Sequence, residues 1–195
     1  MRAAIVAGAA ALAITGAACG GSSPANTAAT PANPNAPEVN TAGDIPDNQV
    51  YVRFAPSGAG FSVKVPEGWS RTAAGGAVTF TDKLNSVRIE SVAAKAPLTV
   101  GTARRATLPQ LAATVKGFQP GTISTVDRSA GKAVRITYLA TAKPDPVTGK
   151  TGTDAVERYV FFHHGRDAVL SLSGPKGADN VDPWRIVTDS LRWTR

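Results

Sequence analysis

The sequence predicts an α+β fold in which an antiparallel sheet of about six to seven strands is packed by two helices. Two observations support this prediction. Segments with the period-two alternation of strands follow one another along most of the chain from Gln49 onward. The hydrophobic period changes to that of a helix twice, once midway through these strands and once near the C-terminus.

The strand at 61–65 organises the predicted domain. Its apolar residues alternate with Ser62 and Lys64, which is the pattern of a strand with one buried face. Pro66 cannot donate a hydrogen bond to a neighbouring strand, so the strand is expected to end there. We expect the turn that follows to place Trp69 in the core.

Other segments show similar alternation and are also predicted to be strands. They are 50–54, 77–82, 87–92, 122–127, 133–142, 154–163 and 168–172. We expect Asn85-Ser86 to be part of a turn between two of them.

The first helix is predicted between residues 99 and 118. Its apolar face is formed by Leu108, Leu111, Ala112, Val115 and Phe118. Pro109 allows two start positions for this helix, because proline is tolerated in the first turn of a helix and kinks a helix when it lies in the interior. Thr107 is the N-cap in the short version. The longer version, from Thr102 to Lys116 with a kink, is the one we favour.

The second helix is predicted to begin at Asp182-Pro183, an N-cap followed by proline. It is expected to bury Trp184, Val187 and Leu191 on one stripe. With Trp69 and Trp193, Trp184 completes a set of three tryptophans that we interpret as core rather than as a sugar-stacking platform.

Residues 1–18 are predicted to be a lipoprotein signal peptide. Arg2 precedes an apolar run at 3–14, which is too short to span a membrane. Small residues at 16–18 precede Cys19, the only cysteine, and resemble a bacterial lipobox, although Gly16 replaces the usual aliphatic residue. We therefore expect Cys19 to be lipidated. The alternative is an ordinary secretory signal cleaved at Ala17-Ala18, and a single cysteine excludes an intramolecular disulfide framework.

Residues 19–48 are predicted to be the lipidated cysteine and a disordered tether, and residues 49–195 a globular domain. The tether is rich in Ala, Asn, Thr and Pro, with almost no bulky apolar side chain. It contains three of the 14 acidic residues and no basic one, and Arg2 lies in the signal. Of 21 basic and 14 acidic residues, 20 and 11 therefore lie from Gln49 onward, which gives a net charge of +9. A basic exported domain is attracted to anionic lipid headgroups or acidic wall polymers, and we do not expect nucleic acid as a partner.

Several short segments of the sequence resemble a known family. The stretch Phe-Ser-Val-Lys-Val-Pro-Glu-Gly-Trp at 61–69 resembles the opening of PsbP-like domains. The segments at 161–166, 170–173 and 190–193 look like that family's last hairpin, helix and terminal strand. With a lipobox and a proline-rich tether, the chain resembles the actinobacterial LpqN-type envelope lipoproteins. The resemblance implies an α/β/α sandwich and a non-catalytic accessory role in envelope assembly or binding, and it implies no ligand residues.

Catalytic motifs are not apparent. Gly149-Lys150-Thr151 is similar to the end of a phosphate-binding loop, but Pro144 stands where that motif requires glycine. His163 and His164 are the two histidines, and neighbours on a strand point to opposite faces, so they do not chelate one metal together. One of them paired with a serine and an aspartate is the basis of an alternative function, an envelope hydrolase or acyl-transferase.

The function predicted from these observations is that of a non-catalytic binding or accessory module on the outer face of the cytoplasmic membrane. Its partner is expected to be an anionic lipid, a glycolipid or an envelope protein, bound in a cleft between the 102–116 helix and the sheet. Arg104 and Arg105 are the expected ligand-binding residues, because they lie where this helix begins. We expect a monomer without metal or cofactor. A purely structural lipoprotein is the third alternative.

Overall fold

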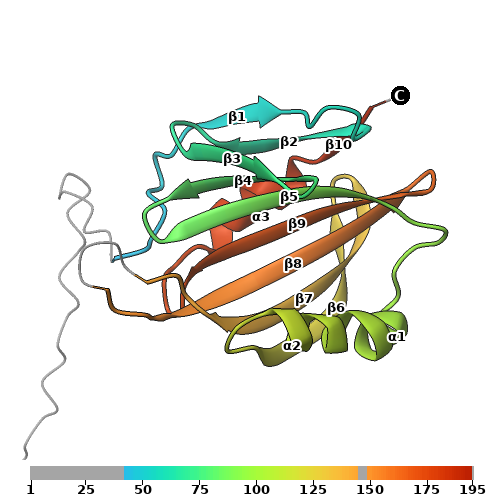
Figure 1. Ribbon diagram of the computed structural model, residues 1–195. Coiled ribbons are helices and arrows are strands. Elements are labelled where there is room, and N and C mark those ends of the chain that lie inside the picture. Colours follow the sequence, from blue (N-terminus) through green and yellow to red (C-terminus); the bar gives the residue numbers. More distant parts are fainter. Residues whose placement is uncertain (1–41, 145–148, 195) are drawn as a thin grey trace, which may run out of the picture. The chain divides into compact units, whose positions relative to one another are not determined.

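The computed structural model describes residues 42–144 and 149–194, in which the chain forms two antiparallel sheets (Figure 1). The larger sheet has seven strands. In spatial order they are β3 (Ser70–Ala74), β4 (Ala77–Asp82), β5 (Asn85–Ala93), β9 (Arg166–Pro175), β8 (Thr153–His163), β7 (Gly131–Thr141) and β6 (Gln119–Arg128). The smaller sheet has the order β1 (Tyr51–Phe54), β2 (Phe61–Pro66) and β10 (Arg192–Trp193). The predicted α+β class with an antiparallel sheet is confirmed.

The organising strand is β2, the middle strand of the smaller sheet. Phe61, Val63 and Val65 are almost completely buried, and Lys64 is exposed. Pro66 is the last residue of the strand, as its missing N–H group predicts. Trp69 lies half-buried against the same core, so its burial is less complete than the sequence suggested.

Two local features of the larger sheet differ from the prediction. Strand β3 was not predicted, because all five of its side chains are exposed and no hydrophobic alternation marks it. The two-residue turn Gly75-Gly76, with φ of +56° and +77°, joins it to β4. Asn85, expected in a turn, instead begins β5 opposite Asp82, and the turn is formed by Lys83 and Leu84.

The first helix begins earlier than predicted and contains an irregular turn. It runs through α1 (Val100–Thr102), a π-helical segment (Ala103–Thr107) and α2 (Leu108–Thr114). Thr99 caps its beginning by accepting a 3.1 Å hydrogen bond from the N–H of Thr102. The wide π-helical turn lies directly before Pro109, where the ring of a proline would crowd the carbonyl four residues earlier. The longer of the two predicted helices is therefore the one that forms, although Ala112 is exposed rather than part of its buried face.

The closing helix, α3 (Val181–Asp189), begins slightly before the predicted Asp182-Pro183. Asn180 occupies its N-cap position, but the Asn180 side chain makes tertiary hydrogen bonds instead of capping the helix. Trp184 and Val187 are buried, as predicted, and Leu191 is buried just beyond the end of the helix.

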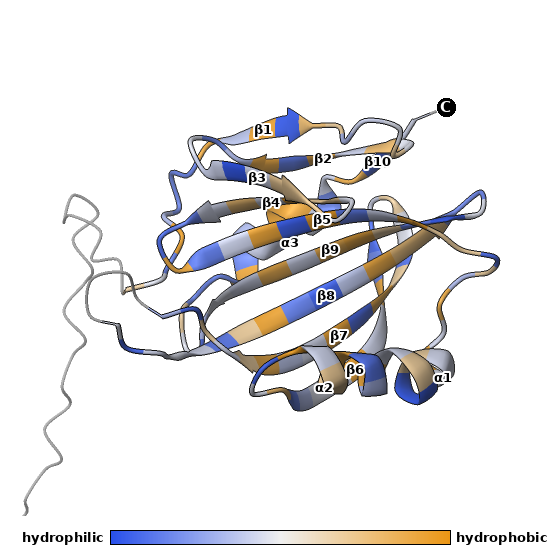
Figure 2. Ribbon diagram, viewed as in Figure 1, coloured by the Kyte–Doolittle hydropathy of each residue, from blue (hydrophilic) through white to orange (hydrophobic). Residues whose placement is uncertain are grey.

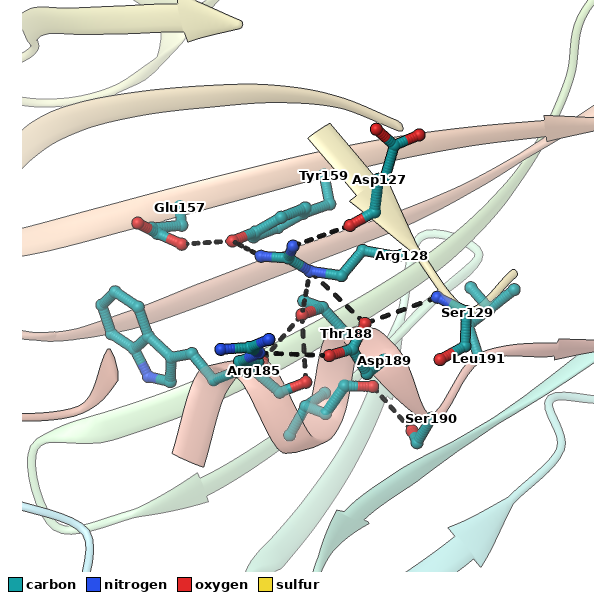
Figure 3. A network of polar contacts seen from close by, with 12 residues as sticks. Asp127, Arg128, Ser129, Glu157, Tyr159, Arg185, Thr188, Asp189, Ser190 and Leu191 are labelled. Atoms are coloured by element: carbon teal, nitrogen blue, oxygen red, sulfur yellow. Dashed lines mark hydrogen bonds and ion pairs between the residues drawn. The ribbon is translucent and has the colours of Figure 1, made fainter. Parts of the chain in front are cut away.

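Arg128 at the end of β6 attaches α3 to the larger sheet (Figure 3). Its Nε donates to the hydroxyl of Thr188 at 3.0 Å, and its Nη2 donates to the Tyr159 hydroxyl at 3.2 Å. Tyr159 in turn donates to the carboxylate of Glu157 at 2.5 Å. Burial, followed by the contact with Glu157, raises the pKa of Tyr159, which keeps this phenol neutral. The network fixes the helix over strands β6 and β8.

The two helices cover opposite faces of the larger sheet (Figure 1). On one face, side chains of β4, β5, β8 and β9 form the main core with α3 and β2. On the other face, a second cluster packs beneath α1–α2, and its buried members are Ala103, Val134, Ile136, Tyr138 and Val156. Hydrophobic and hydrophilic residues alternate along β5, because Val87 and Ile89 belong to the main core whereas Arg88 and Glu90 lie on the other face (Figure 2).

Contacts of the folded unit begin before Gln49, the predicted first residue of the domain. Ile45 is 5% exposed and belongs to the main core. Its N–H donates to Oδ1 of Asn180 at 2.8 Å, and the Gly43 carbonyl accepts from the side chains of Asn85 and Asn180. The folded unit therefore includes residues 43–45, whose backbone groups are the partners of the Asn85 and Asn180 side chains. The predicted signal peptide, Cys19 and the tether up to residue 41 lie outside the described residues.

Candidate functional site

The face of the larger sheet that carries α1–α2 is divided into an apolar and a polar half. The helix packs on the apolar half, which is formed by β6, β7 and part of β8. On β4, β5 and β9 the same face carries hydroxyl and charged side chains, since the residues between them belong to the main core. These polar residues are Thr79, Thr81, Ser86, Arg88, Glu90, Ser171 and Ser173.

One cross-strand row crosses the boundary between the two halves. Arg88 on β5 lies opposite Ser171 on β9, and Ser171 lies opposite Arg158 on β8. The next residue of the row, Ile136 on β7, belongs to the cluster beneath the helix. Arg158 is therefore the last polar residue before the apolar half begins.

A cavity of about 480 Å³ lies at this boundary, between α2 and the sheet. Such a volume falls in the range of small-molecule sites, about 300–1,000 Å³. The sheet and the helical segment each contribute five of its described lining residues. From the sheet come Arg88, Glu90, Tyr138, Arg158 and Ser171, and from the helical segment and its end come Thr107, Gln110, Leu111, Thr114 and Val115.

The charged side chains of the cavity form one hydrogen-bonded group. Glu90 accepts from Nη2 of Arg88 at 3.0 Å through Oε1, and from Nη1 of Arg158 at 3.2 Å through Oε2. The same Nη1 of Arg158 also donates to the Ser171 hydroxyl at 3.0 Å. Side chains of Arg158 and Glu90 are 21% and 20% exposed, and that of Arg88 is 42% exposed. Both guanidinium groups are thus held in place by one carboxylate.

Ionisation states in the cavity follow from these contacts. Burial opposes ionisation of Glu90 and is the largest single influence, but the hydrogen bond from Arg88 and the charges of both arginines outweigh it. The pKa of Glu90 is therefore lowered, and the carboxylate is ionised at neutral pH. Burial raises the pKa of Tyr138, which remains a neutral hydroxyl. The three charged residues together carry a net charge of +1 at neutral pH.

Sequence reasoning placed a cleft between this helix and the sheet, but it did not identify these charged residues. Arg88 and Glu90 are visible in the sequence only as polar positions of an alternating strand. Their approach to Arg158 depends on β9 pairing with both β5 and β8, and β5 and β8 are separated in sequence by the helix and two strands. The sequence signal that pointed to the charged wall was the pair of opposite charges, Arg88 and Glu90, on the polar face of one strand.

The predicted ligand-binding residues Arg104 and Arg105 lie elsewhere on the same helix. Both are exposed on the π-helical segment, and neither belongs to the wall of the cavity. Leu111 and Val115, predicted on the apolar face, do line it, and both also pack against the second hydrophobic cluster. The predicted role of the two arginines in capturing an anionic headgroup remains a prediction.

A second cavity of about 470 Å³ borders the beginning of the helix on the same face of the sheet. Its wall is more apolar, with Leu98, Val100, Val160 and Phe162 contributing side chains, and Lys132 is the only charged residue among the described residues that line it. The polar character of the first cavity is therefore not a general property of this face.

The two histidines occupy the hairpin between β8 and β9. His164, with φ of +44°, and Gly165 form its turn, and the two imidazole centroids are 4.1 Å apart. His163 also stacks on Trp193 at 4.9 Å between ring centroids. Neither imidazole hydrogen-bonds to a serine or a carboxylate within residues 42–144 and 149–194, so the geometry offers no support for the hydrolase alternative. The same residues contain no group of three or more His, Cys, Asp or Glu side chains suited to a metal ion.

No helix within the described part of the chain is long and apolar enough to cross a membrane. Cys19, the predicted lipidation site, lies outside that part.

No protein-family model matches the chain, and no curated protein sequence matches it significantly. Solved structures do match. Cyanobacterial PsbP (CyanoP) of Synechocystis has a TM-score of 0.51 and 13% identity, over 77% of this chain and 98% of its own. A protein of Bacteroides thetaiotaomicron has a TM-score of 0.50 and 16% identity, over 73% of this chain and 48% of its own. The chain therefore spans about half the length of the Bacteroides protein.

LpqN, which is involved in cell envelope biogenesis of Mycobacterium tuberculosis, matches with a TM-score of 0.39 and 15% identity, over 76% of this chain and 87% of its own. That score is too low to support an argument, and the LpqN-type assignment remains a prediction. The likeness to CyanoP concerns the fold alone, because the identity is low. On this structural likeness, the chain has a PsbP-like fold.

Proposed function

We propose that this chain is a non-catalytic binding module of the cell envelope that holds an amphipathic ligand in the cavity beside α2. The observation behind the proposal is the cavity of about 480 Å³, because its walls differ in character. Arg88, Glu90 and Arg158 make the sheet side charged, while Leu111 and Val115 make part of the helix side apolar. A molecule with a polar headgroup and an apolar chain matches both sides.

The predicted location supplies such molecules. A lipidated Cys19 followed by a tether would hold the domain near the outer face of the cytoplasmic membrane, where lipids and glycolipids are abundant. Arg104 and Arg105 are exposed at the start of the same helix, and the chain from Gln49 onward has a net charge of +9. We assign these two arginines to long-range attraction toward anionic headgroups.

A cavity-filling variant tests the proposal. The protein used is the chain without its signal, with Cys19→Ser to prevent acylation, and the probe is decyl maltoside below its critical micelle concentration. Calorimetric titration should detect binding to this protein and at least about tenfold weaker binding to Leu111→Trp, because the indole occupies the cavity. Ala113→Trp places the same side chain at an exposed position of α2 and serves as the control.

Equal binding by both tryptophan variants would show that the amphiphile binds outside the cavity. If the parent protein binds neither decyl maltoside nor the charged amphiphile decyl phosphate, the proposed function is refuted. An envelope protein would then be the better candidate partner.

A further inference from the structure

We propose that Arg88 and Arg158 form a headgroup site for a phosphate or carboxylate on the ligand, with Glu90 as the carboxylate that holds the two guanidinium groups in place. This inference rests on the proposed function, and it specifies the chemical class of the ligand. Neither arginine was identified from the sequence, and both lie apart from the exposed Arg104 and Arg105.

The two guanidinium groups retain free hydrogen-bond donors. Arg88 donates to Glu90 only through Nη2, and Arg158 donates to Glu90 and Ser171 only through Nη1. Nη1 of Arg88 and Nη2 of Arg158 have no hydrogen-bond partner among the described residues. A guanidinium group offers five N–H donors in a planar fork that matches a carboxylate or phosphate.

The cavity wall carries an excess of positive charge. Among the ten described residues that line the cavity, Glu90 is the one acidic side chain, and two are arginines. Both oxygens of Glu90 are already engaged, so the carboxylate neutralises one positive charge and leaves the other. An anionic group would complete the charge balance, whereas a cationic headgroup would face two guanidinium groups.

The two arginines lie where the polar part of the cavity wall meets its apolar part. Arg158 lies at the last polar place of the cross-strand row, and the cavity wall continues from it to Tyr138, Leu111 and Val115. An anion held by the arginines would therefore have its attached chain directed along apolar side chains. Hydroxyl groups of Ser171 and Thr107 line the same cavity and suit the remaining oxygens of a headgroup.

An alternative is that the Arg88–Glu90–Arg158 group only stabilises the sheet. A headgroup site predicts that the protein prefers an anionic amphiphile to a neutral one, whereas a purely stabilising group predicts no such preference. We would titrate the signal-free protein with Cys19→Ser against decyl phosphate, decyl maltoside and inorganic phosphate. Decyl phosphate is expected to bind at least about tenfold more tightly than decyl maltoside, because charge-assisted hydrogen bonds add to the same chain contacts.

Arg88→Gln is the decisive variant, since Arg88 is the more exposed arginine and its loss should leave the fold intact. It should bring the two affinities within about threefold of one another, mainly because decyl phosphate binds more weakly. Arg104→Gln is the matched control, because it removes the same charge from an exposed position outside the cavity and should keep the tenfold preference.

The outcomes separate the two proposals. Equal affinity of the parent protein for both amphiphiles, or equal losses in Arg88→Gln and Arg104→Gln, would overturn the headgroup site and leave the proposed function standing. Inorganic phosphate that binds as tightly as decyl phosphate would overturn the proposed function and keep the anion site. If Arg88→Gln unfolds, as judged by circular dichroism, Arg88→Lys replaces it. Lysine keeps the charge but loses the planar fork, and it should still reduce the preference.

Discussion

At Glu90 two opposing effects act on one carboxylate. Partial burial opposes its ionisation, and the two arginines that donate to it favour ionisation. The arginines together have the larger effect, so the pKa is lower in the folded chain than the ordinary value of 4.5. A carboxylate of this kind stabilises the fold above its unfolded pKa, and this contribution is lost as the pH falls through the lowered folded pKa.

Glu90→Gln should therefore lower the free energy of unfolding at pH 7, by on the order of 1–3 kcal/mol, because two charged hydrogen bonds are weakened. The difference from the parent protein should shrink as the pH falls below about 4.5, and it should be smallest near pH 3. Urea denaturation at pH 7, 5 and 3 measures it. Glu67→Gln, at an exposed turn, is the control and should show little change at any pH. A loss for Glu90→Gln that is as large at pH 3 as at pH 7 would exclude the carboxylate charge as its cause.

On the scale of elements, the segment Gly43–Pro46 belongs to the fold although it has no regular secondary structure. Ile45 is buried in the main core, and the amides of Asn85 and Asn180 bind the backbone of Gly43 and Ile45. A side chain at Gly43 would lie 2.4 Å from the ring of Pro175, so the close approach requires glycine. The segment thus connects β5, β9 and the beginning of α3.

Two deletions test the importance of this segment. Removing residues 20–41 should leave the melting temperature nearly unchanged, in line with the tether predicted there. Removing residues 20–48 also removes Ile45 and leaves the Asn85 and Asn180 amides without their backbone partners. It should cost about 3 kcal/mol or more, from lost apolar burial and unpaired buried amides. Thermal and urea denaturation of both proteins decide the matter, and equal stability of the two would mean that Gly43–Pro46 contributes nothing.

The predictability of each element depended on whether one of its faces is buried. Strand β2, whose apolar residues alternate with Ser62 and Lys64, was predicted nearly to its end because alternation records burial directly. Strand β3, at the edge of the sheet, buries no side chain and so leaves no such record. Asn180 was not predicted as the position before α3, because its side chain serves Gly43 and Ile45, which lie far away in sequence.

The candidate site was predictable in place but not in composition. Leu111 and Val115 follow from the helical period, and with the sheet they indicated where a cleft would lie. The charged wall requires knowledge that β9 lies between β5 and β8, and local patterns do not contain the order of non-consecutive strands. Arg104 and Arg105 were chosen because they adjoin the helix in sequence, whereas Arg88 and Arg158 adjoin it in space.

For the whole molecule, the proposed attachment to the membrane has two parts of different physical character. An acyl anchor on Cys19 binds through the hydrophobic effect and is insensitive to salt. Attraction of the basic domain to anionic headgroups is electrostatic, and at an ionic strength of about 0.15 M it is screened over roughly 8 Å. Ionic strength therefore separates the two contributions in one experiment.

Cell fractionation of three proteins makes this separation: the wild type, Cys19→Ala and Cys19→Ala with Arg104→Glu and Arg105→Glu. The wild type should remain with the membrane at low and high salt. Cys19→Ala should be released into the medium or retained only at low salt, because charge attraction alone is left. The triple variant should show weaker retention than Cys19→Ala at low salt, since two positive charges at the exposed start of the helix become negative and the net charge falls by four units. Equal release of the wild type and Cys19→Ala would refute the anchor. Low-salt retention that is the same in both Cys19→Ala proteins would refute the role of Arg104 and Arg105.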